Sequence, residues 1–425
     1  MGLSVSFVAV ASELHLARAR EVAEQAYSTL RAEGLNVIGS PEPVLKPEEL
    51  RKAVSVPADI KLVFVASGGT SRLMREALAG VEAILWAHLS DNSLPSALSA
   101  REKLRASGAW ASEIVFSRPD KLPDELKAEI KAIRTIKAIS EATVIAVCGE
   151  EKALEIQGTL EELLGAKAPG IKRISVRALL GQAEARMERP SLSEAISMLK
   201  GITGEEVTPE LEEGLIKSVQ LANFISEKLL KGARTPIITF DCFDMIREVG
   251  LAPCVVVGLL LERGIVAVCE ADPSALLLMA ACYLLSGSPP WMANLARFNL
   301  EANTLLLAHC TACPSLAASW PYRGTFLPHF ESGRPVALDI WLKRGSVVIA
   351  NLQVGRRKLV LARGRVRDSG LGEERLCRTQ ALVELDCDIK AFLAEAGNHQ
   401  ILSYPDIYLE LCRLGRRLGL EVVAL

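Results

Sequence analysis

The acidic and imidazole side chains of the C-terminal half are the residues of this sequence best suited to chemistry. The chain has five histidines, and two of them, His309 and His399, follow an acidic pair, Glu270 and Asp272, that comes after an apolar run. Two or three carboxylates with two imidazoles form an oxygen and nitrogen ligand set that suits Mn²⁺, Mg²⁺ or Co²⁺, with Zn²⁺ as an alternative. Together these residues predict a divalent-metal site.

Each of these residues also has an ordinary structural interpretation. Asp272 precedes Pro273, and an aspartate at that position is a good helix N-cap. A single histidine at the end of a buried strand, as at His309, is more often a core residue, and a loop histidine such as His399 is usually solvated. Helix capping explains Glu270 less well. No single residue favours a metal site, but the combination of these residues does.

The N-terminal part of the chain is expected to fold into alternating strands and helices. Apolar runs at 4–11, 61–66 and 84–88 predict buried strands separated by helices, which implies a parallel sheet covered on both faces. Ligands of such sheets lie at the carboxyl ends of the strands. Polar loops at 67–70 and 90–93 fall at those ends, and we expect them to face a ligand.

The rest of the chain predicts a second α/β unit and then a β-rich unit. After a charged helix at 121–138, strands are expected at 143–148, 235–240 and 266–270, and a helix at 273–285. Beyond residue 303, short apolar runs separated by turn residues predict strands at 304–308, 335–341, 346–353, 358–366 and 380–385. The expected fold is α/β, with two Rossmann-like α/β domains (1–140 and 141–302) followed by a C-terminal β-rich, barrel-like domain (303–425).

Composition excludes several classes of partner. Of 425 residues, 50% are hydrophobic, and the formal net charge is −2 with no strongly basic block. We therefore expect neither nucleic acid nor an anionic membrane as a partner. No apolar run has the length of a membrane span, and the first residues predict a strand and not a signal peptide.

The ten cysteines indicate a reducing compartment, so we expect free thiols and a cytoplasmic protein. Several of them lie within apolar stretches, where a free cysteine behaves as a small hydrophobic residue. The one CxxC pair, Cys310 and Cys313, has no second CxxC to complete a zinc site. We interpret it as the end of a strand.

Four stretches of the sequence resemble the L-fucose/L-arabinose isomerase superfamily, in its shorter fucose-isomerase-like branch. The run that ends in Glu270-Ala271-Asp272 resembles the family's strand ending in Glu-Gly-Asp or Glu-Asn-Asp. The stretch 303–314 resembles one that ends in a metal-binding histidine and a nearby Cys-Pro, and Asn398-His399 is similar to the family's Asn-His or His-His loop. The N-terminal likeness lies in Gly68-Gly69-Thr70 and 92–98.

The resemblance implies three domains and aldose–ketose isomerisation with Mn²⁺, or with Co²⁺ or Mg²⁺. By position, Asp244 and Glu270 match the family's two catalytic, metal-binding carboxylates, and His309 and His399 match its imidazole ligands. Asp272 is an alternative carboxylate ligand. Asp244 stands where arabinose isomerases have Glu, Ala271 where many members have Gly, and Gln400 where many have a second His.

The expected mechanism moves a carbonyl between C1 and C2 of a sugar through an enediol. One proton leaves carbon and one returns, which a positioned carboxylate can carry out, so Asp244 and Glu270 are the expected acid/base pair. A divalent cation that chelates both sugar oxygens stabilises the charge of the enediol. Substrate contacts are expected from Gly69, Thr70, Asn92 and His329.

Oligomerisation is part of the same expectation. In the resembling isomerases the first domain of one subunit covers the active site of its neighbour, which implies a homo-oligomer, a hexamer or another assembly built from trimers, with shared sites. Trp86 and His88 would then lie near the substrate, although both also fit a core.

Two other kinds of function fit the same sequence. The chain could be a catalytically silent carbohydrate-binding or regulatory homologue, which would bind sugar without metal and form no ketose. It could also be a metal-dependent lyase or epimerase; a lyase would release a shorter fragment.

Overall fold

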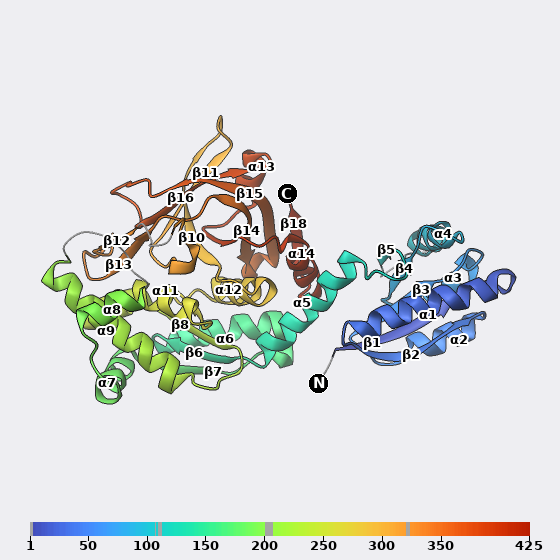
Figure 1. Cartoon of the computed structure of the whole chain (residues 1–425), viewed down its shortest axis with the longest axis horizontal. Coiled ribbons are helices and arrows are strands. Elements are labelled where there is room, and N and C mark those ends of the chain that lie inside the picture. Colours follow the sequence, from blue (N-terminus) through green and yellow to red (C-terminus); the bar gives the residue numbers. More distant parts are fainter. Residues whose placement is uncertain (1–2, 107, 109–112, 200–206, 320–323) are drawn as a thin grey trace. The chain divides into compact units, whose positions relative to one another are not determined.

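The computed structural model of this chain describes residues 3–106, 108, 113–199, 207–319 and 324–425. The chain divides into two compact units, Met1–Arg134 and Thr135–Leu425. The first unit has one sheet, and the other sheets belong to the second unit (Figure 1). Both of the domains expected after residue 140 lie within the second unit.

The first unit is a five-stranded parallel sheet in the order β2-β1-β3-β4-β5. Alternate residues of its central strands are buried on opposite faces, because one face contacts α1 and α5 and the other contacts α2, α3 and α4. The elements are β1 (Ser4–Val10), α1 (Leu16–Ala32), β2 (Asn36–Val44), α2 (Pro47–Val54), β3 (Ile60–Val65), α3 (Ser71–Ala77), β4 (Ile84–Ala87), α4 (Ser93–Ala106), β5 (Glu113–Phe116) and α5 (Asp124–Ser140).

The second unit begins with a four-stranded parallel sheet in the order β7-β6-β8-β9. Its strands are β6 (Thr143–Val147), β7 (Ile171–Ile174), β8 (Pro236–Phe240) and β9 (Val266–Val268). Its helices are α6 (Glu150–Leu164), α7 (Val176–Arg186), α8 (Leu192–Met198), α9 (Pro209–Phe224), α10 (Cys242–Val249), α11 (Cys254–Glu262) and α12 (Pro273–Ser286).

The rest of the second unit contains a closed barrel of six antiparallel strands. The ring runs β14-β17-β10-β11-β16-β15 and closes because β14 also pairs with β15. Its strands are β10 (Trp291–Asn299), β11 (Thr304–His309), β14 (Gly345–Gln353), β15 (Lys358–Ser369), β16 (Thr379–Leu385) and β17 (His399–Ser403). Outside the ring are the pair β12 (Gly324–Leu327) and β13 (Ala337–Ile340), the helices α13 (Ile389–Glu395) and α14 (Tyr408–Arg417), and β18 (Glu421–Ala424), which adds to β15.

Helix α12 joins the parallel sheet to the barrel. It contacts β9 on one side and β14 and β17 on the other, and it lies between the two layers in Figure 1. Most of its side chains are buried, as expected for a helix that is hydrophobic all round. Its N-terminus, capped by Asp272, therefore lies where the sheet meets the barrel strands.

The mixed α/β fold with parallel sheets and a C-terminal barrel confirms the coarse prediction. The barrel begins earlier than expected, because the missed strand β10 (Trp291–Asn299) lies before residue 303. Its second half is largely exposed and lacks the apolar alternation that marks a strand. Helices α6, α8, α10 and α13 were also missed.

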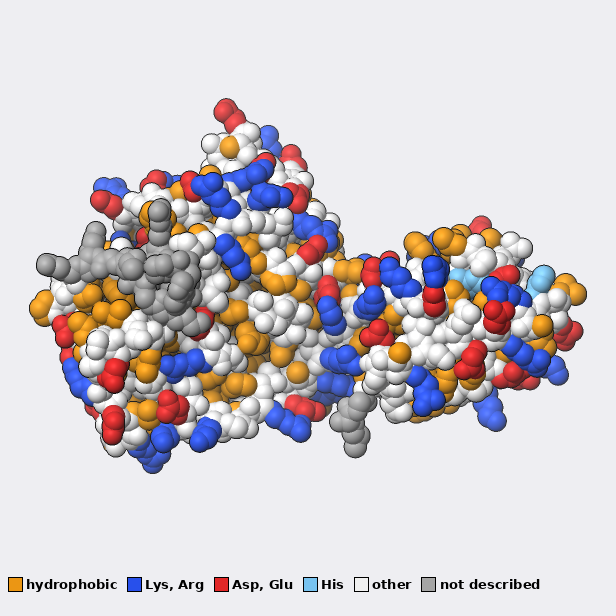
Figure 2. Space-filling model, in the orientation of Figure 1, with side chains coloured by type: hydrophobic (Ala, Val, Ile, Leu, Met, Phe, Trp, Pro, Cys, Tyr) orange, Lys and Arg blue, Asp and Glu red, His pale blue; other side chains and the backbone are white. Residues whose placement is uncertain are grey.

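Positively and negatively charged side chains are mixed on the surface. Basic and acidic side chains are interspersed over the face shown in Figure 2, in agreement with a net charge of −2. Among the described residues, no helix combines the length and apolar character needed to cross a bilayer.

Candidate metal centre

Glu270 and Ala271 form a tight turn where β9 ends. Both have positive φ angles, 62° and 47°, a region that residues with a Cβ seldom occupy. The Ala271 N–H donates to the carbonyl oxygen of Phe240 at the end of β8 (2.9 Å), which holds the turn against the sheet. The left-handed backbone at a polar strand end is the kind of strain that clusters at functional sites.

His309 and His399 come from barrel strands that flank β10. Asn294 of β10 pairs with Ala308 of β11 on one side and with His399 of β17 on the other. The end of β11 and the start of β17 therefore lie at the same level of the barrel. The two imidazole rings approach to 6.4 Å between centroids.

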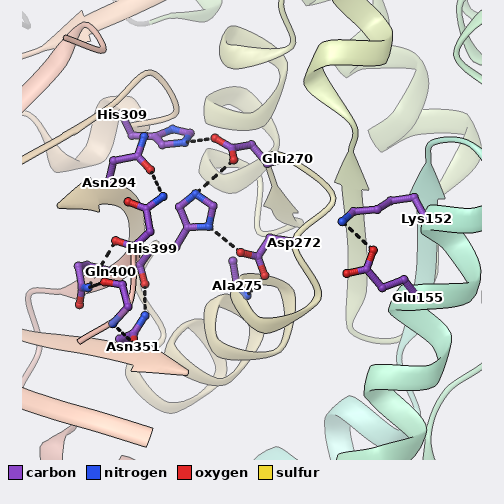
Figure 3. Close-up of polar contacts among 12 residues, drawn as sticks. Lys152, Glu155, Glu270, Asp272, Ala275, Asn294, His309, Asn351, His399 and Gln400 are labelled. Carbon is purple, nitrogen blue, oxygen red and sulfur yellow. Dashed lines mark hydrogen bonds and ion pairs between the residues drawn. The ribbon is translucent and has the colours of Figure 1, made fainter. Parts of the chain in front are cut away.

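Glu270, His309 and His399 converge on one point. Their potential ligand atoms all lie within 4.8 Å of one another. His309 Nε2 is 3.4 Å from Glu270 Oε1, and His399 Nε2 is 3.2 Å from Glu270 Oε2 (Figure 3). One carboxylate and two imidazole nitrogens facing one another form a ligand set for a divalent cation.

The other nitrogen of each imidazole ring is held by a neighbouring side chain. His399 Nδ1 lies 2.6 Å from Asp272 Oδ2, and His309 Nδ1 lies 3.0 Å from Thr311 Oγ1. Metal-binding histidines are typically fixed in this way, through the nitrogen that does not face the ion. Asn351 also donates to the His399 carbonyl oxygen (2.7 Å).

The arrangement leaves His399 Nε2 without a hydrogen bond. This nitrogen is buried and has no partner of acceptable geometry, although Glu270 Oε2 is only 3.2 Å away. We therefore regard that contact as an attraction between charges and not as a directed hydrogen bond. A buried, unpartnered imidazole nitrogen beside a carboxylate fits a metal ligand.

The electrostatics show how the site compensates its charges without a metal. Burial opposes ionisation of Glu270, but His309 and His399 outweigh it and hold the pKa of this carboxyl well below its usual range. Burial likewise opposes charge on His399, and Asp272 and Glu270 outweigh it and raise the His399 pKa to about 9. Burial also opposes ionisation of Asp272, but contacts with His399 and the Ala275 N–H outweigh it and lower the Asp272 pKa. A proton on His399 thus supplies positive charge between two carboxylates.

Asp272 has two roles in this geometry. Its Oδ1 accepts the Ala275 N–H (3.0 Å) and so caps α12, while its Oδ2 contacts His399. The expected capping role is confirmed. The second contact makes Asp272 the residue that orients His399.

Asp244 is not brought into this cluster. It lies in the first turn of α10 and forms an ion pair with Arg247, one turn further along the same helix. A Cβ on Gly149, after β6, would lie 3.9 Å from Asp244 Oδ2. Since β6 and β9 flank β8 on opposite sides, Asp244 lies on the β6 side and Glu270 on the β9 side.

The expected substrate residues of the N-terminal unit lie together at the ends of β3 and β4. Gly68 N–H donates to the Asp91 carbonyl oxygen (2.7 Å), which joins the two loops. Asn92 has a φ of 52°, and a Cβ on Gly68 would lie 2.6 Å from its Cβ. Thr70 is buried, with its hydroxyl bonded to Ser67 and Ser96, and Gly69 lines a surface cavity.

Two of the other histidines, His88 and His329, are engaged within the protein, whereas His15 is exposed. His88 is buried, stacks on Phe64 and approaches the Ala66 carbonyl oxygen at 3.2 Å. His329 is buried, with Nδ1 3.1 Å from Ser332 Oγ. A substrate contact by His329 stays a prediction.

A cavity adjoins His399 on its Asp272 side, between the start of α12 and the strands β14 and β17. Glu270 and His309 are not part of its walls, which are formed by Asp272, Ser274, Ala275, Leu278, Asn351, Leu352, Gln353, Gly397, Asn398, His399 and Ile401. Amide side chains among these residues can hydrogen bond a hydroxylated ligand.

Sequence reasoning missed Thr311 and Asn351, which orient the two histidines. Thr311 lies two residues after His309, so it could have been suspected as a hydrogen-bond partner. Asn351 is in the interior of β14 and carried no signal of its own. The chain matches no protein-family model, and comparison with curated proteins finds no significant match.

Proposed function

We propose that this protein is a divalent-metal-dependent aldose–ketose isomerase acting on a fucose- or arabinose-like sugar. The observation that supports it most is the convergence of Glu270, His309 and His399 at the junction of sheet and barrel. The resemblance to the L-fucose/L-arabinose isomerase superfamily, carried by the same residues, supplies the reaction.

Glu270, His309 and His399 would hold the ion, which we take to be Mn²⁺, with Co²⁺ or Mg²⁺ as alternatives. When bound, the cation would stabilise negative charge that develops on two adjacent sugar oxygens. Asp272 and Thr311 would keep the Nε2 atoms of His399 and His309 directed at it.

The low pKa of Glu270 indicates whether this carboxylate is better suited to metal binding or to acid/base catalysis. A group that takes and returns protons works best with a pKa near the operating pH. Held well below its usual range, the Glu270 carboxyl is better suited to binding a cation than to taking a proton. We therefore propose Glu270 as a metal ligand first, and the acid/base role expected of Glu270 and Asp244 stays a prediction.

The test is ketose formation from a panel of aldoses by the Mn²⁺-loaded protein. We expect turnover with an aldose of the fucose or arabinose type, and its loss in Glu270→Gln. Glu301→Gln is the matched control, since Glu301 is exposed and in the same unit. Sugar binding without metal and without ketose would instead identify a silent homologue, and a shorter product would identify a lyase.

Assembly and location belong to the same proposal. We infer a cytoplasmic homo-oligomer, a hexamer or another trimer-based assembly. Loops 67–70 and 90–93 of one subunit would cover the site of another, and Gly69, Thr70 and Asn92 belong to these loops.

A further inference from the structure

Three cysteines and a histidine gather next to the candidate metal centre. Potential ligand atoms of Cys254, Cys310 and His329 lie within 4.8 Å of one another, and all three residues are buried. A fourth residue, the partly buried Cys377, packs against the cluster that contains Cys254 and Cys310. These residues come from the start of α11, the segment after β11, the loop after β12 and the segment before β16.

A close approach of α11 to the chain after β11 brings the first two together. Gly258 lies against the backbone of Ala312, where a Cβ would be 3.0 Å from the Ala312 carbonyl oxygen. Cys254 is one turn before Gly258, on the same side of the helix. The contact at Gly258 therefore places Cys254 against Cys310.

The cluster is arranged as a set of ligands. His329 Nδ1 lies 3.1 Å from Ser332 Oγ, so Nε2 is the ring nitrogen that this contact does not engage. The Arg378 N–H donates to Cys310 Sγ (3.4 Å), an interaction that favours a negatively charged sulfur.

The thiols are costly to ionise without a cation. Cys254 and Cys310 are buried and Cys377 packs against them, so an unpaired thiolate at this place would lack solvation. A bound divalent ion removes this penalty, because it takes the place of the thiol protons and compensates the sulfur charge.

We propose that Cys254, Cys310, Cys377 and His329 bind one Zn²⁺ ion in a site separate from that of Glu270, His309 and His399. Three thiolates and one imidazole are a four-coordinate set that zinc favours in structural sites, whereas Mn²⁺ and Mg²⁺ prefer oxygen. The ion links α11 and the strand pair β12–β13 to the ends of the barrel strands β11 and β16. This inference does not rest on the proposed isomerase activity.

The alternative is that the cysteines act as small apolar residues. They pack with Ala252 and Ala337, and a buried free cysteine is ordinary in a core. Cys313, the second cysteine of the CxxC pair, lies outside the cluster and contacts Ser315. The pair in the sequence is therefore not the metal-binding unit.

The experiment uses Co²⁺ as a spectroscopic substitute for Zn²⁺ in the full chain, kept reduced with a phosphine. The His399→Ala background removes the neighbouring centre. We expect one Co²⁺ per chain with a thiolate-to-cobalt charge-transfer band, displaced by Zn²⁺. Cys254→Ser and Cys310→Ser should weaken Zn²⁺ binding by more than about 100-fold, since loss of a supporting residue alone costs roughly 10–100-fold.

Cys282→Ser is the matched control, because Cys282 is a fully buried cysteine of α12 outside the cluster. It should retain the band. Absence of the band, or equal Zn²⁺ affinity in the Cys310→Ser and Cys282→Ser proteins, would overturn the proposal. X-ray absorption of the Zn²⁺-loaded wild-type chain needs no variant, and a zinc shell of nitrogen and oxygen alone would also overturn it.

Discussion

At the scale of residues, His399 determines how the proposed centre responds to pH. In the metal-free protein its pKa is raised to about 9 by Asp272 and Glu270, so it carries a proton at neutral pH. A metal ion needs the neutral ring and must displace that proton. The two carboxyls have lowered pKa values and stay ionised throughout this range.

We therefore expect Mn²⁺ affinity to rise with pH. The increase should be about tenfold per pH unit below pH 9 and should level off above it, because one proton is released on binding. Calorimetry across this range, in buffers of different ionisation enthalpy, measures both the affinity and the proton count. An affinity independent of pH would mean that His399 is not a ligand.

Asp272 should act on the metal through His399. Asp272→Asn keeps helix capping, since Asn and Asp cap equally well, but it removes the charge that holds Nδ1. We expect roughly 10–100-fold weaker Mn²⁺ binding with little change in stability. Asp388→Asn, at the N-cap of α13, is the matched control, and equal effects of the two changes would argue against the role of Asp272.

At the scale of elements, the turn after β9 is the feature that delivers Glu270. Ala271 occupies a left-handed conformation (φ 47°) that glycine adopts without strain. Because relief of strain and the added chain entropy of glycine oppose each other, Ala271→Gly should change the free energy of unfolding by less than about 1 kcal/mol.

A β-branched residue has no such compensation. Ala271→Val should cost roughly 1–3 kcal/mol in the free energy of unfolding, and more if the buried site cannot take the added volume. Urea denaturation of both variants makes the comparison. A Gly variant less stable than the Val variant would show that the turn is not strained.

The sequence predicted elements better than it predicted the contacts between them. Helix α12 was predicted from local signals, an apolar run after Asp272 and Pro273. Strand β10 is half exposed and carries no local sequence signal of a strand. Its pairing with β11 and β17 nevertheless brings His309 and His399 together. Cys254 and Cys310 are far apart in the chain and meet because α11 packs at Gly258 against the backbone of Ala312, which no spacing rule reveals.

At the scale of the whole molecule, the proposed ligands all belong to the unit Thr135–Leu425. Deletion of residues 1–134 should therefore leave one Mn²⁺ site per chain. If the N-terminal unit covers a neighbouring site, the deletion should lower turnover and change the oligomeric mass. A truncated protein with the parent's mass and full activity would show that this unit is no lid.

Mixed oligomers test the shared site more sharply. A chain with Thr70→Ala and Asn92→Ala is expected to lose the substrate contacts of its N-terminal loops. A chain with His399→Ala is expected to lose metal binding. Co-assembly should restore part of the activity, because some sites receive both intact halves. No recovery in verified mixed oligomers would place each site within one subunit.

The most direct measurement of the central claim is isomerisation in heavy water by the Mn²⁺-loaded protein. An enediol mechanism exchanges the transferred proton with solvent. We expect ketose that carries deuterium at the carbon that receives the proton, and no ketose from the metal-free protein or from His399→Ala. Unlabelled ketose would contradict the enediol, and the absence of ketose from every aldose tested, in a protein shown to hold Mn²⁺, would contradict the proposed activity.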